Sequence, residues 1–162
     1  IKNLKSEKST VYIPLHYFPE ATTEYWISDL NKATYYPYFY QVLSELDKNG
    51  YDVYIKEHPA MFLKRDVKFL KIINSFTNVY LISPFISTFD ILKIVDISLI
   101  WTGTTGIESF INGNPTYKVC ENYFSDFFTP FSKLNSNHLV YPKDHEKKLL
   151  IEKILSNTIK ID

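Results

Sequence analysis

The chain alternates between two hydrophobic patterns. Runs of consecutive apolar and β-branched residues, typical of strands buried on both faces, occur at 10–15, 51–56, 79–82, 95–101 and 116–119. Between and after them, apolar residues recur at helical spacing, which predicts helices at about 36–48, 66–75, 105–112 and 145–156. Strands that alternate with helices favour an α/β fold. We therefore expect a parallel sheet of about five or six strands with helices on both faces.

Turn residues mark the ends of these elements. Asn49-Gly50 closes the first helix, since glycine tolerates the left-handed conformation at a helix end. Residues 87–90 (Ser-Thr-Phe-Asp) have the spacing of a capping box and predict the start of another helix. The aromatic stretch 123–131 is expected to be irregular. Residues 1–9 are polar and lysine-rich, which predicts a linker or frayed start before a single domain at 10–162.

Composition excludes several classes of function. The 18 basic residues balance the 18 acidic residues, so the basic excess expected of a nucleic-acid-binding protein is missing. The single cysteine, Cys120, excludes an internal disulfide and a cysteine-based zinc site, and fits a reducing compartment. Neither a His-x-x-x-His pair nor a carboxylate cluster suggests a metal site. No apolar stretch approaches the roughly 20 residues of a membrane span.

The segment Lys56-Glu57-His58-Pro59 directly follows the strand expected at 51–56. Ligands of open parallel sheets collect beyond the carboxyl ends of the strands. Pro59 ends strand pairing because it has no N–H, and it biases His58 towards extended geometry. Lys56 alternates with His58, so we expect both side chains to leave on the same side and to meet a phosphate. The alternative is that His58 caps a neighbouring carbonyl and Lys56 is a solvated strand end.

A turn rich in hydroxyl groups and glycine follows the strand at 95–101 and opens the next helix. Its sequence is Thr-Gly-Thr-Thr-Gly-Ile-Glu at 102–108, and the free N–H groups of a helix start suit an anion. The two glycines would let a ligand approach the backbone, and the glutamate could accept from ribose hydroxyls. The phosphate- and nucleotide-binding candidates here are Gly103, Thr104, Thr105, Gly106 and Glu108. The local alternative is a capping box formed by Thr105 and Glu108.

A third candidate segment leaves the first strand. Two prolines stiffen the chain on either side of His16, at positions 14 and 19. Held in this way, His16 and Glu20 could serve as acid, as base or as contacts to a donor sugar. The alternative is a structured loop whose aromatic rings pack beneath a neighbouring helix, which is the commoner fate of such rings.

Four segments, in this order along the chain, resemble bacterial capsule polysaccharide biosynthesis proteins. They are Pro-Leu-His-Tyr-x-Pro-Glu-Ala-x-Thr at 14–23, Lys-Glu-His-Pro at 56–59, Thr-Gly-Thr-x-Gly-x-Glu at 102–108 and Gly-x-Pro at 113–115. Those proteins are glycosyltransferases of the GT-B type, which has two Rossmann-like domains. This chain resembles their C-terminal, nucleotide-sugar-binding half over about residues 10–141. The His-Pro pair with a later hydroxyl-rich turn is also similar to bacterial sialyltransferases and Kdo transferases, which use CMP-sugars.

The resemblance implies sugar transfer in capsular or surface polysaccharide biosynthesis, without an essential metal. The nucleotide-sugar would be a substrate and not a cofactor, with a CMP-sugar favoured over a UDP-sugar. By resemblance, His58, Thr104 and Thr105 would contact the donor phosphate. A glycan or glycolipid acceptor would bind through an N-terminal partner domain, so this half alone would bind nucleotide without completing the reaction. A cytoplasmic location, at the inner face of the membrane beside membrane-bound assembly machinery, is compatible with this function.

Two alternatives stay open at this point. One is a CDP-polyol phosphotransferase of the teichoic-acid type, which also has a His-Pro segment. Those enzymes usually carry an aspartate with a serine pair where this chain has residues 102–108. The other is a non-catalytic nucleotide-binding module, since a fold alone does not establish chemistry.

Overall fold

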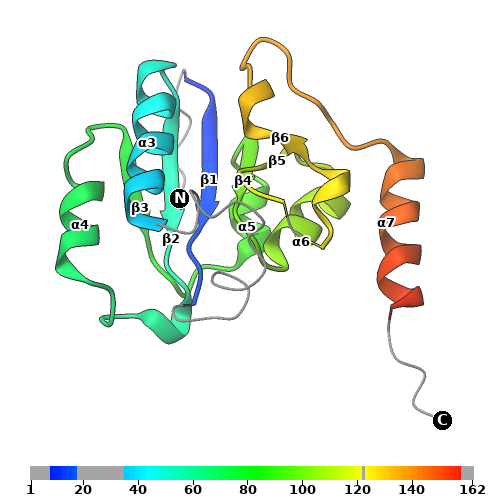
Figure 1. Ribbon diagram of the computed structural model, residues 1–162, viewed down its shortest axis with the longest axis horizontal. Coiled ribbons are helices and arrows are strands. Elements are labelled where there is room, and N and C mark those ends of the chain that lie inside the picture. Colours follow the sequence, from blue (N-terminus) through cyan, green and yellow to red (C-terminus); the bar gives the residue numbers. More distant parts are fainter. Residues whose placement is uncertain (1–7, 18–34, 122, 158–162) are drawn as a thin grey trace.

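The computed structural model describes residues 8–17, 35–121 and 123–157, and its centre is a six-stranded sheet (Figure 1). Every neighbouring pair of strands is parallel. The sheet order is β3-β2-β1-β4-β5-β6. The strands are β1 (Thr10–Pro14), β2 (Asp52–Lys56), β3 (Val79–Ile82), β4 (Ile97–Ile100), β5 (Thr116–Lys118) and β6 (Thr129–Pro130). The predicted α/β class and the parallel sheet are confirmed.

Helices connect the strands and cover both faces of the sheet. The α-helices are α3 (Tyr35–Lys48), α4 (Val67–Ile73), α5 (Thr88–Leu92), α6 (Thr105–Asn112) and α7 (Asp144–Ser156). The short 3-10 helices of the described segments are η1 (Pro59–Met61), η2 (Ser125–Phe127) and η3 (Phe131–Lys133). Figure 1 shows α3 and α4 on one face, with α5 and α6 on the other. In the described part of the chain, no helix is both long and apolar enough to span a bilayer.

One local expectation from the sequence is wrong, and a second is confirmed only in part. The stretch 123–131 is not irregular, because η2 and the edge strand β6 lie within it. A two-residue strand leaves no periodic pattern that a sequence could reveal. The helix start predicted at 87–90 is confirmed, because α5 begins at Thr88 with Ser87 as its N-cap residue. The capping box itself is absent, because the side chain of Ser87 makes no capping hydrogen bond. The N–H of Asp90 donates instead to the backbone oxygen of Ser87, at 3.1 Å.

The strands are apolar throughout because they are buried on both faces. Alternate residues of β1, Val11 and Ile13, pack with Phe39 and Leu43 of α3 in the main core. Between them, Tyr12 points to the opposite face, where it packs with Ile91 of α5 in a second cluster. This two-sided burial explains why the strands carry unbroken hydrophobic runs instead of an alternation of apolar and polar residues.

The sheet order reverses direction between β1 and β4. The chain winds outward from β1 through β2 to β3, then crosses back and continues from β4 to β6. Asp96, just before β4, fixes the amino ends of these two central strands together. Its carboxylate accepts from both the N–H and the hydroxyl of Thr10, each at 2.8 Å, and its own N–H donates to that hydroxyl at 2.9 Å. The carboxyl ends of β1 and β4 therefore open side by side at a topological switch point.

Substitution of Asp96 by alanine tests this connection. We expect Asp96→Ala to lower the free energy of unfolding by about 1–3 kcal/mol, because two hydrogen bonds to a charged acceptor are lost and Thr10 is buried. Urea denaturation measures the change. Asp90→Ala is the matched control, since that carboxylate only pairs with Lys93 on the exposed surface of α5 and should be nearly neutral. An equal loss in the two variants would contradict this role for Asp96.

Candidate functional site

The loops after β1 and β4 meet at the switch point through His16 and Thr102. The Nδ1 atom of His16 lies 3.4 Å from the hydroxyl oxygen of Thr102, and both side chains are buried. Gly103 follows with φ +93°, a left-handed conformation that favours glycine. A Cβ added at Gly103 would lie 3.9 Å from the same ring nitrogen. Two of the segments predicted from sequence thus come together, although they are 86 residues apart.

His58 lies beside this junction with one ring nitrogen engaged locally. It is the N-cap residue of η1, and its Nδ1 accepts from the N–H of Ala60 at 3.2 Å. The edge of its ring faces Tyr17, with 5.6 Å between the ring centroids. Since Nδ1 accepts, the proton of the neutral ring resides on Nε2. His58 is exposed, so capping leaves Nε2–H available as a donor to a ligand.

Lys56 has different neighbours from His58. Its ammonium donates to the hydroxyl of Thr88, at the start of α5, at 3.2 Å. Burial lowers the pKa of Lys56, and the carboxylate of Glu108 on α6 acts in the opposite direction. The alternation that would direct Lys56 and His58 to the same side ends with β2, at Lys56. Lys56 therefore belongs to a polar group at the first turns of α5 and α6.

The start of α6 differs from the capping box suggested by its sequence. The N-cap is Thr104, not Thr105, and its side chain makes no capping hydrogen bond. The N–H of Glu108 donates to the backbone oxygen of Thr104 at 3.1 Å. Glu108 is therefore one residue beyond the position that a capping box requires. Helix geometry leaves the preceding N–H groups, including that of Thr105, without a partner inside the helix.

Packing explains the absence of a side chain at Gly106. This glycine is buried, and an added Cβ would lie 2.8 Å from Cε2 of Phe128. Its lack of a side chain lets α6 pack closely on the segment around β6. Phe128 therefore occupies the Cα side of Gly106, while the approach of a ligand to its backbone N–H stays a prediction. At Gly103 an added Cβ would make only an ordinary contact with His16.

Arg65, which no sequence pattern singled out, holds the two histidine segments together. Its Nε and Nη2 atoms donate to the two carboxylate oxygens of Glu57 at 2.8 and 2.6 Å, and the two side chains are only 5% and 10% exposed. Nη2 also donates to the backbone oxygen of His16 at 2.7 Å. Glu57 in turn accepts from the N–H of His58 at 2.8 Å. The sequence hints at this ion pair only through Glu57, a carboxylate that directly follows the apolar strand β2.

Burial keeps His16 uncharged. Desolvation lowers the pKa of His16 to about 4, and the positive charge of Arg65 and the ring of His58 act in the same direction. At neutral pH the imidazole is therefore a hydrogen-bonding group without charge. General acid and base catalysts work best with a pKa near the working pH, so this environment suits a sugar or phosphate contact better than proton transfer. The second catalytic candidate, Glu20, lies outside the described residues.

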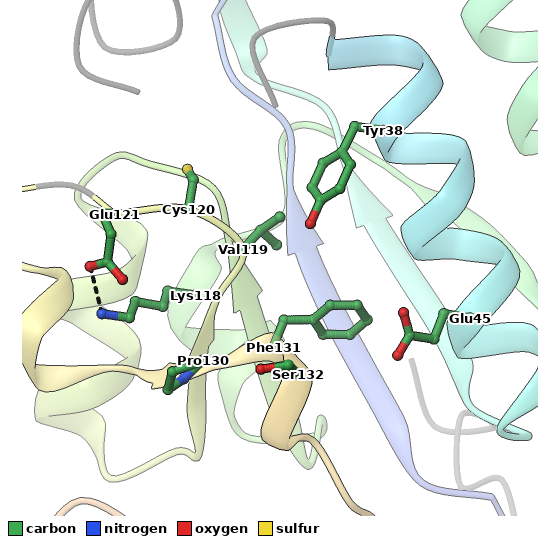
Figure 2. A pocket seen from close by; sticks show the side chains of 9 residues that line it. All are labelled: Tyr38, Glu45, Lys118, Val119, Cys120, Glu121, Pro130, Phe131 and Ser132. Atoms are coloured by element: carbon green, nitrogen blue, oxygen red, sulfur yellow. Dashed lines mark hydrogen bonds and ion pairs between the residues drawn. The ribbon is translucent and has the colours of Figure 1, made fainter. Parts of the chain in front are cut away.

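A pocket of about 230 Å³ lies between α3 and the segments at the ends of β5 and β6 (Figure 2). The hydroxyl of Tyr38 and the ring of Phe131 point into the space between α3 and the end of β5. On the opposite wall, the ammonium of Lys118 pairs with the carboxylate of Glu121 at 2.7 Å. Its wall is connected to the switch point, because the thiol of Cys120 donates to the backbone oxygen of Trp101 at 3.0 Å. The volume is below that of a site for a drug-sized ligand, so the pocket suits a single ring.

No protein-family model matches the chain, and no curated protein sequence matches it. Solved structures do match its fold. The β-Kdo 2,7-transferase KpsC of Thermosulfurimonas dismutans aligns with 90% of this chain, with a TM-score of 0.60 and 13% identity. The β-Kdo 2,4-transferase KpsC of the same organism aligns with 91% of it, with a TM-score of 0.57 and 14% identity. The chain has a glycosyltransferase-like fold.

These matches concern part of each transferase. The chain spans 45% of the length of each Kdo transferase structure. The wall teichoic acid polymerase TagF aligns over 95% of this chain and 39% of its own, at 17% identity and a TM-score of 0.47. At such identities the likeness is one of fold. The six-stranded parallel sheet is consistent with one half of a GT-B fold.

Removal of the arginine tests the clamp, the buried ion pair between Arg65 and Glu57 that connects the two histidine segments. We expect Arg65→Met to lower the free energy of unfolding by about 3–5 kcal/mol, because it leaves a buried carboxylate without its partner. The double variant Arg65→Met/Glu57→Leu should recover much of that loss, since no charge then stays buried. Recovery should be incomplete, because the backbone groups of His16 and His58 still lack their partners. Equal instability of the two variants in urea denaturation would contradict this account.

The buried imidazole of His16 predicts a pH dependence of stability. The folded protein binds this proton only near pH 4, whereas the unfolded chain binds it near the ordinary value of 6.5. The unfolded state therefore takes up more protons between these values, and stability falls by about 3 kcal/mol as the pH drops through this range. His16→Gln should remove this component from denaturation curves recorded at several pH values. His58→Asn should retain most of it, since burial and Arg65 lower the pKa of His16 more than His58 does. The same slope in wild type and His16→Gln would contradict the assignment.

Proposed function

We propose that this chain is the donor-binding half of a glycosyltransferase that builds capsular or other surface polysaccharide from a nucleotide-sugar, with a CMP-sugar as the favoured donor. The observation that carries the proposal is the contact between His16 and Thr102 at the switch point of the sheet, with His58 beside it. Ligands of open α/β sheets bind in this crevice. The fold shared with the two Kdo transferases supports the same assignment.

The charges around the junction suit a leaving phosphate. Negative charge builds on that phosphate as the bond between sugar and oxygen breaks, and preorganised donors stabilise it. His58 would donate through Nε2, and the first turn of α6 would donate through the N–H groups at Thr104 and Thr105. Lys56 would add a positive charge that Thr88 holds in position. This arrangement requires no divalent cation, and the glycan or glycolipid acceptor would bind through a second domain.

The other parts of the donor have candidate partners close by. His16 is neutral and buried, so it would make a hydrogen bond to the sugar or the phosphate. Glu108 would accept from the ribose hydroxyls while it balances the charge of Lys56. The pocket between Tyr38 and Phe131 would take one ring of the donor. With the parts of the donor bound in these places, the bond between the sugar and the phosphate would lie next to the switch point.

Calorimetric titration with CMP, CDP, UMP, UDP and ADP tests the proposal. We expect pyrimidine nucleotides to bind, with CMP strongest, and binding to persist in EDTA. His58→Asn is the decisive variant, because an asparagine oxygen can still cap Ala60 whereas the Nε2 donor is lost. Affinity should fall about tenfold or more, as expected for a hydrogen bond to a charged group, and the melting temperature should stay unchanged.

The control is His145→Ala, an exposed histidine at the start of α7. It should leave nucleotide affinity unchanged. Equal binding of all nucleotides, or none in a folded sample, would overturn the donor-site assignment. A requirement for magnesium or manganese would overturn the proposal that protein groups alone stabilise the phosphate charge. It would leave the fold and the position of the site unchanged.

A further inference from the structure

A strained turn follows η1 at the carboxyl edge of the sheet. The N–H of Lys64 donates to the backbone oxygen of Met61 at 2.9 Å, and Phe62 between them has φ −54° and ψ 126°. Leu63 follows with φ +61°, and within the described residues it is the only residue other than glycine with a positive φ. These angles define a type II turn, whose third position normally holds glycine or asparagine. A leucine there is unfavourable to the backbone.

Packing inside the protein does not explain this leucine. Its side chain is 89% exposed. Phe62 beside it is 47% exposed, and its ring meets that of Phe85 edge to face with 5.3 Å between the centroids, while Phe85 is itself 71% exposed. Phe62, Leu63 and Phe85 thus form an apolar tip that points into solvent. Strain that persists without an internal contact is characteristic of functional segments.

Lysines follow the apolar tip. Lys64 is the last residue of the turn, and Lys68 and Lys71 are exposed one turn apart on α4, so they lie on one helix face. Arg65 is not part of this set, because Glu57 and His16 engage it in the interior. The carboxylate of Asp66 is used in capping α4, where it accepts from the N–H of Lys68 at 2.8 Å. The segment therefore presents exposed apolar side chains in the turn and exposed positive charges in the residues that follow it.

We propose that the apolar tip and the lysines of α4 bind the surface of an anionic lipid bilayer. Side chains of this kind enter the boundary between headgroups and acyl chains, while lysines behind them pair with anionic headgroups. A protein partner fits less well, since a stable interface buries about 800 Å² on each partner and the tip consists of three side chains. Figure 1 places the turn between η1 and α4 at the edge where β1 and β2 end. Binding there would bring the candidate site next to the membrane.

Sedimentation with vesicles tests this surface independently of nucleotide binding. The probes are vesicles of phosphatidylcholine alone and of phosphatidylcholine mixed with phosphatidylglycerol. We expect the chain to bind the anionic vesicles and to lose binding as salt is raised. Leu63→Gly should weaken binding about tenfold, the order expected when one leucine side chain no longer enters an apolar phase. It should not lower the melting temperature, because glycine adopts this φ without steric strain.

Two further variants complete the test. Leu155→Ala removes an equally apolar exposed leucine from α7 and should leave vesicle binding unchanged. The triple variant with Gln in place of Lys64, Lys68 and Lys71 should abolish the preference for phosphatidylglycerol. The proposal is overturned if wild type does not sediment with anionic vesicles, or if Leu63→Gly binds them as wild type does. It is also overturned if the tip instead supports self-association that Leu63→Gly abolishes. None of these measurements involves nucleotide binding, so they test the membrane proposal separately from the proposed function.

Discussion

The geometry of the candidate site depends on one buried ion pair. Arg65 and Glu57 are almost fully removed from solvent, which is unfavourable for two charges unless each is fully hydrogen-bonded. The bidentate pairing meets that requirement, and the remaining donor and acceptor capacity goes to the backbone of His16 and of His58. The interaction therefore fixes two loops that leave different strands. Neither histidine has to be ordered by the ligand, and such preorganisation reduces the entropy lost on binding.

Charge is distributed unevenly around this clamp. On the side of α4, the positive charge of Arg65 is neutralised internally, and His16 is held uncharged by burial. On the side of α5 and α6, Lys56 keeps its ammonium next to Glu108. A phosphate at the strand ends would find hydrogen-bond donors on the first side and a cation on the second. Such a separation orients a ligand as well as binding it.

The architecture could be predicted from the sequence to a large extent, whereas the contacts within the site could not. Strands such as 51–56 are recognisable because two-sided burial produces unbroken apolar runs, and parallel strands place their following residues at one edge. Side-chain partners carry no such signature. The clamp between Arg65 and Glu57 and the packing of Gly106 on Phe128 depend on the path of the chain in three dimensions. The capping-box pattern at Thr105 and Glu108 was misleading because the N-cap of α6 is Thr104, so Thr105 is already the first helical residue.

The place of β1 in the middle of the sheet has a consequence for biosynthesis. This first strand needs β2 on one side and β4 on the other, so its second edge stays unpaired until residue 100 has left the ribosome. A parallel sheet cannot replace that partner with a local hairpin, because each connection requires a crossover. The emerging chain therefore carries an apolar, half-paired strand while all the residues between β1 and β4 are synthesised. Such strands are prone to aggregation, so this risk ends only when β4 pairs with β1.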